Sequence, residues 1–377
     1  MKKRDNSNLK WLEEFAQEGY FDDFSEDHFI KRILREDGDL PDKFQTEIFQ
    51  ICKRDNSNRV KIDAISFYAS FSARLSNMLN LFDENDIKKF VEAQLSAGKD
   101  KYNEDTFFQA ISEITCINYV ANIVPESNDI YVEYEPTTNG KKNPEARIIS
   151  GEKNLDKFRY DIEVKTPVFK GIQLDSNKKY LKVNIPLSDK NRDIVQGMAD
   201  QYDYNVIWPN FYKIKDFINS AGSKFIEPTS VEDINILFIN WTFINPKESK
   251  IMEPCALLMN EKNGLLRNNK YHNIVGIDED MLKKISAIVI YCDNYDSFMG
   301  QNLLNAIHSG LCKIIYNNQF CQFVDKSKIS NELRIQEVCE VDIKAFEEWG
   351  NLKSNNKKDY DDAIVISETC KIVYKNE

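Results

Sequence analysis

The stretch Arg159-Tyr160-Asp161-Ile162-Glu163-Val164-Lys165-Thr166-Pro167 decides the fold of this chain of 377 residues. Apolar and charged residues alternate along it, and successive side chains of a β-strand point to opposite faces of a sheet. The pattern therefore predicts a strand whose apolar face, formed by Tyr160, Ile162 and Val164, packs on a core. The opposite face carries the charged side chains, those of Arg159, Asp161, Glu163 and Lys165.

Glu163 and Lys165 are predicted on the same strand face. An isolated Glu-x-Lys triplet is usually a solvated strand face in a chain whose residues are 29% charged. A carboxylate can also bind a divalent cation, and an ammonium beside it can orient a water molecule or offset charge on a phosphate. Because this face is polar, substitution of either residue is expected to change stability little. The neighbouring sequence decides between the two interpretations.

Two further segments precede this strand. Apolar residues at helical spacing from Phe107 to Val120 predict a packed helix that carries Glu113 at the edge of its apolar stripe. Lys142-Asn143-Pro144-Glu145 then introduces the next strand. A helix glutamate, a Pro-Glu strand start and Glu-x-Lys on the following strand, in this order, resemble the PD-(D/E)xK nuclease superfamily. The resemblance runs from about Thr106 to Pro167.

The order of predicted elements agrees with this resemblance. The predicted strands are 129–134, 146–149, 160–165 and 234–241, and Asn139-Gly140 is a hairpin signal between the first two. The predicted helices are 106–121, 189–202 and 212–220. Helix, three strands, helix, strand is the order of the superfamily's common core.

Three regions are expected along the chain. Residues 1–100 are predicted to be helical, with helices near 62–81 and 86–96. Residues 101–245 form the nuclease-like core, and 246–377 either extend it or form a small appended α/β domain. The expected fold class is α/β (α+β), with a restriction-endonuclease-like mixed sheet flanked by helices.

The resemblance implies a set of catalytic residues, namely Glu113, Glu145, Glu163 and Lys165. It implies that Mg²⁺ or Mn²⁺ is bound by the carboxylates of Glu145, Glu163 and Glu113 and by the carbonyl of Val164. Hard oxygen ligands suit these ions. Lys165 would position or help to deprotonate the attacking water.

Glu145 departs from the commonest form of the motif, because the superfamily usually has aspartate at this position. Asp161 is therefore an alternative second carboxylate, since it shares the predicted strand face of Glu163. Glu133 and Glu135 are weaker alternatives, which ordinary exposed strand positions explain better.

Composition limits the remaining possibilities. A net charge of −11 argues against a protein that coats nucleic acid by bulk charge, although a local basic groove is compatible with it. The eight cysteines form no Cys-x-x-Cys pair and are interpreted as buried free thiols of a cytoplasmic protein. The start of the chain lacks a signal-peptide pattern, and no apolar run is long enough to span a membrane.

The expected function is that of a metal-dependent nuclease that hydrolyses phosphodiester bonds in nucleic acid, with DNA as the expected substrate. A restriction or phage-defence effector is the biological role suggested by analogy of fold. The alternative is a non-catalytic interaction protein that retains a nuclease-like fold. A homodimer or a protein partner is compatible with either interpretation.

Overall fold

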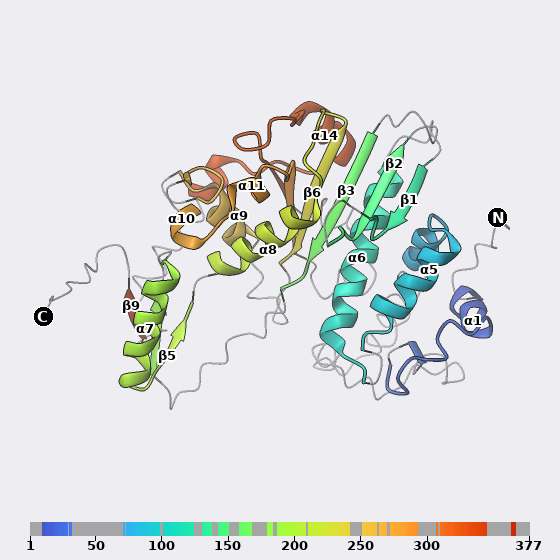
Figure 1. The fold of residues 1–377 in the computed structure, drawn as a ribbon, viewed down its shortest axis with the longest axis horizontal. Coiled ribbons are helices and arrows are strands. Elements are labelled where there is room, and N and C mark those ends of the chain that lie inside the picture. The colour runs from blue at the N-terminus through green and yellow to red at the C-terminus, as the bar shows by residue number, and fades with distance from the viewer. Residues whose placement is uncertain are drawn as a thin grey trace, which may run out of the picture.

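The computed structural model of this chain is a mixed α/β structure built around a six-stranded sheet (Figure 1). A smaller sheet has three strands. The structure describes residues 10–28, 30–31, 71, 73–98, 101–123, 130–137, 142–150, 158–167, 179–183, 187–208, 210–241, 251–261, 264–269, 272–292, 307, 310–344 and 363–366.

The large sheet has the strand order β1-β2-β3-β6-β7-β8. Its strands are β1 (Ile130–Tyr134), β2 (Ala146–Ser150), β3 (Phe158–Lys165), β6 (Asp233–Asn240), β7 (Ala287–Tyr291) and β8 (Cys312–Tyr316). The first three pair antiparallel, β3, β6 and β7 pair parallel, and β8 is antiparallel to β7. The parallel strands β6 and β7 are buried almost throughout, as is typical of strands covered on both faces. Part of the region 246–377 therefore extends the same sheet.

Helices cover both faces of this sheet (Figure 1). α6 (Glu104–Ile123) packs on the face that carries Tyr160, Ile162 and Val164, together with α1 (Lys10–Gln17), α5 (Glu84–Phe90) and the π-helical segment η2 (Val91–Leu95). α8 (Phe211–Lys224), α9 (Met252–Met259), α10 (His272–Val275) and α11 (Glu279–Leu282) pack on the opposite face. A short helix, α14 (Lys326–Leu333), follows β8 and joins the core of the α6 face.

The smaller sheet has the order β5-β4-β9, with all strands parallel. Its strands are β4 (Lys179–Val183), β5 (Tyr204–Ile207) and β9 (Ala363–Ile366). α7 (Asp189–Gln201) connects β4 to β5, and the Ser188 hydroxyl caps its first turn by accepting a hydrogen bond from the Asn191 N–H. β9 joins this sheet, so the last described strand does not belong to the large one.

α8 approaches α11 closely because of a glycine. A Cβ atom at Gly222 would overlap the main-chain oxygen of Met281, so a larger residue would push the two helices apart. Gly222 lies two residues before Lys224, the last residue of α8. This contact therefore fixes the end of α8 against the rest of its layer.

The predicted core elements from 106 to 241 are all present, with bounds that differ by a few residues. The predicted helix 86–96 is divided, because α5 continues into the π-helical η2 before the chain turns at Gly98, whose φ is +99°. Asn139-Gly140, 62–70 and 72 lie outside the described residues, and the described part of the predicted helix 62–81 is helical at 71 and 73–79. Five cysteines are buried as predicted, but Cys339 is exposed, which corrects the expectation for that thiol. Among the helices that the structure describes, none has the length and apolarity needed to cross a bilayer.

Candidate active site

Glu145 and Glu163 face each other across two neighbouring strands. Glu145 immediately precedes β2, and its N–H donates a hydrogen bond of 2.9 Å to the main-chain oxygen of Ile162. Since Ala146 pairs with Ile162 in the antiparallel register, the residue opposite Glu145 is Glu163. Side chains directly opposite in such a pair lie on one sheet face. The structure thus brings together the two carboxylates that the motif predicts.

Both carboxylates are buried, although the charged face of β3 could have been open to solvent. Glu163 is 0% exposed and Glu145 is 7% exposed. Two carboxylates removed from water need a cation or protons to offset their repulsion. Glu163 is therefore not an exchangeable surface residue, and the expectation that its substitution leaves stability unchanged does not fit this burial.

Two lysines supply positive charge to this pair. The ammonium of Lys224, at the end of α8, lies 3.0 Å from Oε1 of Glu145 and 2.8 Å from Oε1 of Glu163. Lys165 Nζ lies 2.5 Å from the same Glu163 oxygen. Glu163 Oε2 has no hydrogen-bond partner in the described part of the chain. One carboxylate oxygen is thus surrounded by cations, while the other is buried and unsatisfied.

Glu113 reaches this region from α6 and is also buried, with 3% of its surface exposed. Its Oε1 accepts a hydrogen bond of 2.5 Å from Nε2 of Gln94, and its Oε2 has no partner among the described residues. Burial, followed by the negative charge of Glu145, raises the pKa of Glu113 well above its usual range. A glutamate in this position could have extended into solvent, but the structure turns it inward.

The charges of the site alter each other's ionisation. Burial raises the pKa of Glu163 to about 7, and the charge of Glu145 adds to this effect, while Lys165 and Lys224 oppose it. Burial disfavours the ammonium of Lys224, but attraction to Glu163 and Glu145 outweighs burial and raises its pKa. The two lysines therefore offset only part of the electrostatic cost of holding the two buried carboxylates close together.

Asp161, the alternative second carboxylate, is engaged elsewhere. Nε and Nη2 of Arg147 donate to its two oxygens at 2.6 and 2.9 Å, which is the bidentate geometry of a strong arginine–carboxylate pair. Arg147 lies directly opposite Asp161 in the strand register. Of the weaker alternatives, Glu135 pairs with Lys89 at 2.9 Å, and Glu133 lies opposite Arg147 on β1. The geometry therefore favours Glu145 as the partner of Glu163.

The donor set suits a small divalent cation through two carboxylates. Among the described residues, no three histidine, cysteine, aspartate or glutamate side chains are gathered closely enough to hold a metal ion. Mg²⁺ commonly uses one or two carboxylates and completes its coordination with water and substrate phosphate. Glu145 and Glu163 fit this requirement, and Oε2 of Glu163 has no other partner among the described residues. Val164 lies between Glu163 and Lys165, and its carbonyl stays a predicted ligand.

Lys224 and Gln94 are the residues of this cluster that the sequence did not indicate. A lysine in the last turn of a helix is ordinarily explained by the helix dipole, and Lys224 lies beyond the predicted end of its helix at 220. Gln94 lies on η2, and π-helical segments occur often at functional sites. The sequence predicts a single helix over 86–96 and so gives no signal for Gln94, because the π-helical division is seen only in the structure.

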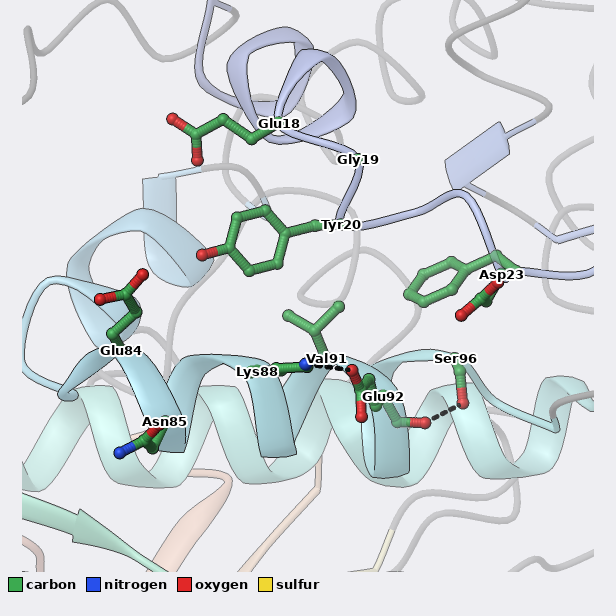
Figure 2. A pocket seen from close by; sticks show the side chains of 11 residues that line it. Glu18, Gly19, Tyr20, Asp23, Glu84, Asn85, Lys88, Val91, Glu92 and Ser96 are labelled. Atoms are coloured by element: carbon green, nitrogen blue, oxygen red, sulfur yellow. Dashed lines mark hydrogen bonds and ion pairs between the residues drawn. The ribbon is translucent and has the colours of Figure 1, made fainter.

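A separate cavity of about 420 Å³ lies between the N-terminal segment and α5 (Figure 2). Four of its eleven lining residues are acidic, namely Glu18, Asp23, Glu84 and Glu92, of which Glu92 pairs with Lys88 at 3.7 Å. None of the four predicted catalytic residues lines it. The cavity and the carboxylate pair are therefore distinct places on the molecule.

Comparison of this chain with protein-family models, with curated proteins and with solved structures finds no significant match. The resemblance to the PD-(D/E)xK nuclease superfamily therefore rests on the order of Glu113, Glu145, Glu163 and Lys165 in the sequence.

Proposed function

We propose that this protein is a divalent-metal-dependent nuclease with a restriction-endonuclease-like core, which hydrolyses phosphodiester bonds in nucleic acid and acts on DNA. One observation carries the proposal. Glu145 and Glu163 oppose each other on neighbouring strands and share one cation, with Lys165 on the same strand as Glu163. The pair is buried, and Oε2 of Glu163 has no hydrogen-bond partner among the described residues. An ion pair with only a structural role would be expected to have both carboxylate oxygens satisfied.

In this proposal Glu145 and Glu163 hold Mg²⁺ or Mn²⁺, with the Val164 carbonyl as a further oxygen donor. Glu113 acts through water, because the three carboxylates are not gathered closely enough in the described structure to bind one ion together. The bound ion supplies stabilisation of the negative charge that develops on the phosphate and on the leaving oxygen. Gln94 holds one oxygen of Glu113 and leaves the other without a partner among the described residues. Orientation of the attacking water is assigned to Lys165.

Lys165 is the residue that meets the attacking water. Its side chain is 20% exposed, whereas Glu163 beside it is fully buried, so the ammonium marks the solvent side of the pair. An ammonium donor there can orient a water molecule toward phosphorus and offset charge on a non-bridging phosphate oxygen. Its ion pair with Glu163 restricts the conformers of the long side chain before substrate arrives.

One observation favours the non-catalytic alternative. Lys165 and Lys224 together place two positive charges against Glu145 and Glu163, so this ion cluster can persist without a metal. A scaffold protein would keep such a cluster for stability and would not hydrolyse nucleic acid. The two interpretations differ in metal binding and in turnover, which can both be measured.

The proposal is tested by incubating the purified chain with supercoiled plasmid, linear duplex DNA, single-stranded DNA and RNA, each with Mg²⁺, Mn²⁺ or excess chelator. Cleavage of DNA is expected with either cation and not with chelator, and Glu163→Gln is expected to abolish it. Lys313→Met is the matched control, because Lys313 is a buried lysine that contacts Gln336 and Asp342 away from this site. Cleavage that persists in chelator, or an absence of cleavage on every substrate, would refute the proposal.

A further inference from the structure

We propose that Lys224 occupies the cation position of this site in the resting protein, and that a divalent metal binds only when its ammonium withdraws. The inference rests on the proposed function, because it concerns the metal site of that nuclease. It adds Lys224, a residue of α8 that is not part of the motif, as the group that controls whether a divalent metal can bind to the two carboxylates.

The positions of the atoms lead to this inference. Lys224 Nζ bridges Oε1 of Glu145 and Oε1 of Glu163, at 3.0 and 2.8 Å. These are the carboxylates that a metal would share. A divalent ion in contact with the same two oxygens would lie within a few ångströms of the ammonium, where the two cations repel strongly in a buried environment. Metal and ammonium therefore exclude each other.

The location of Lys224 at the end of its helix allows its ammonium to leave this position. Lys224 is the last residue of α8, and the chain becomes extended at Phe225 directly after it. Its side chain is 17% exposed, so the flexible four-carbon stem has a route to solvent. Of the two lysines, Lys224 is the one that bridges both carboxylates, whereas Lys165 contacts Glu163 from its own strand.

The ammonium is also an incomplete substitute for a metal. It leaves Oε2 of Glu163 and Oε2 of Glu113 without partners among the described residues, although both side chains are buried. A divalent ion brings twice the charge and can accept several oxygen donors at once. The exchange of Lys224 for a metal therefore provides a partner for the Glu163 oxygen that the resting arrangement leaves unsatisfied.

The first test measures Mn²⁺ binding to the full chain by electron paramagnetic resonance of free Mn²⁺, without substrate. Lys224→Met is expected to bind Mn²⁺ about tenfold tighter or more, because no ammonium has to be displaced. Lys313→Met is expected to bind like the wild type, and Lys224→Gln replaces Lys224→Met if that variant does not fold. Equal or weaker binding by the neutral Lys224 variants would overturn the inference.

The second test uses the wild-type protein and amine-reactive labelling read by mass spectrometry. Saturating Mn²⁺ is expected to increase the labelling rate of Lys224 and to leave that of Lys313 unchanged. An unchanged rate at Lys224, with Mn²⁺ demonstrably bound, would show that the ammonium stays with the carboxylates and would overturn the inference alone. Failure of every variant and of the wild type to bind Mn²⁺ would instead remove the metal site, and with it the proposed function.

Discussion

Replacement of Glu163 by glutamine should stabilise the metal-free protein, although Glu163 is the residue we place at the centre of the site. Burial and the charge of Glu145 raise the pKa of Glu163 from 4.5 to about 7. A group whose pKa is raised on folding opposes folding when it is ionised, so the penalty is present above pH 7 and disappears as the pH falls toward 4.5. The difference in pKa corresponds to roughly 3 kcal/mol at pH 8. Glutamine has nearly the shape of the protonated form and should recover most of this free energy.

The matched control is Asp161→Asn, on the same strand and the same sheet face. Asp161 is also 0% exposed, but Arg147 binds both of its oxygens. Its loss leaves the partly buried guanidinium of Arg147 without its paired charge and should destabilise the protein by up to roughly 3–5 kcal/mol. The two substitutions remove the same charge at positions two residues apart and should therefore have opposite signs.

Urea unfolding in chelator, followed by tryptophan fluorescence at pH 8 and at pH 5, measures both effects. The stabilisation by Glu163→Gln should be large at pH 8 and should shrink at pH 5, where the wild-type carboxyl is protonated in the folded state. A loss of stability at pH 8 comparable to that of Asp161→Asn would refute the reasoning, because it would show that the lysines hold Glu163 in a favourable ion pair.

Two further predictions concern parts of the fold that support the site. Burial lowers the pKa of His28 from 6.5 to about 4, and its ring joins the Leu95 carbonyl to the Ile30 N–H. Roughly 3 kcal/mol of stability should therefore be lost as the pH falls from 6.5 to 4. The unfolding free energy of the wild type minus that of His28→Gln should show this pH dependence, and a pH-independent difference would contradict it. Gly222→Ala should lower the free energy of unfolding by about 1–3 kcal/mol, because the added Cβ would overlap Met281. Gly197→Ala is the control: it has open space around it in α7 and should raise the free energy of unfolding by up to about 1 kcal/mol. Equal effects of the two substitutions in thermal denaturation would show that α8 does not need its close approach to α11.

The strands and helices around the motif could be predicted because each is encoded locally. The alternation from Tyr160 to Lys165 defines β3, and the apolar stripe of 106–121 defines α6. The motif order also placed Glu145 beside Glu163, since two strands joined by a short connection pair antiparallel and their registers align the two residues. Local patterns were therefore sufficient for the strands and helices of this part, whereas the choice between Glu145 and Asp161 as the second carboxylate needed the structure.

The lysine bridge and the burial of the site depend on contacts distant in sequence. Lys224 is 79 residues from Glu145, and no periodic pattern specifies that the end of α8 reaches the start of β2. Alternation along β3 shows that one face is charged, but it cannot show that other elements cover this face and leave Glu163 fully buried. Asp161 and Glu163 look equivalent in the sequence, and only the cross-strand position of Arg147 distinguishes them.

The most direct test of the central claim is the single-turnover rate of DNA cleavage with Mg²⁺ for Lys165→Met and Glu145→Gln, with Lys313→Met as the control. Loss of a group that acts on the water or on the metal removes several kcal/mol of transition-state stabilisation, so both rates should fall by about a thousandfold or more. The control should cleave like the wild type. Rates for Lys165→Met and Glu145→Gln that stay near that of the control would contradict the assignment of this site as a nuclease centre.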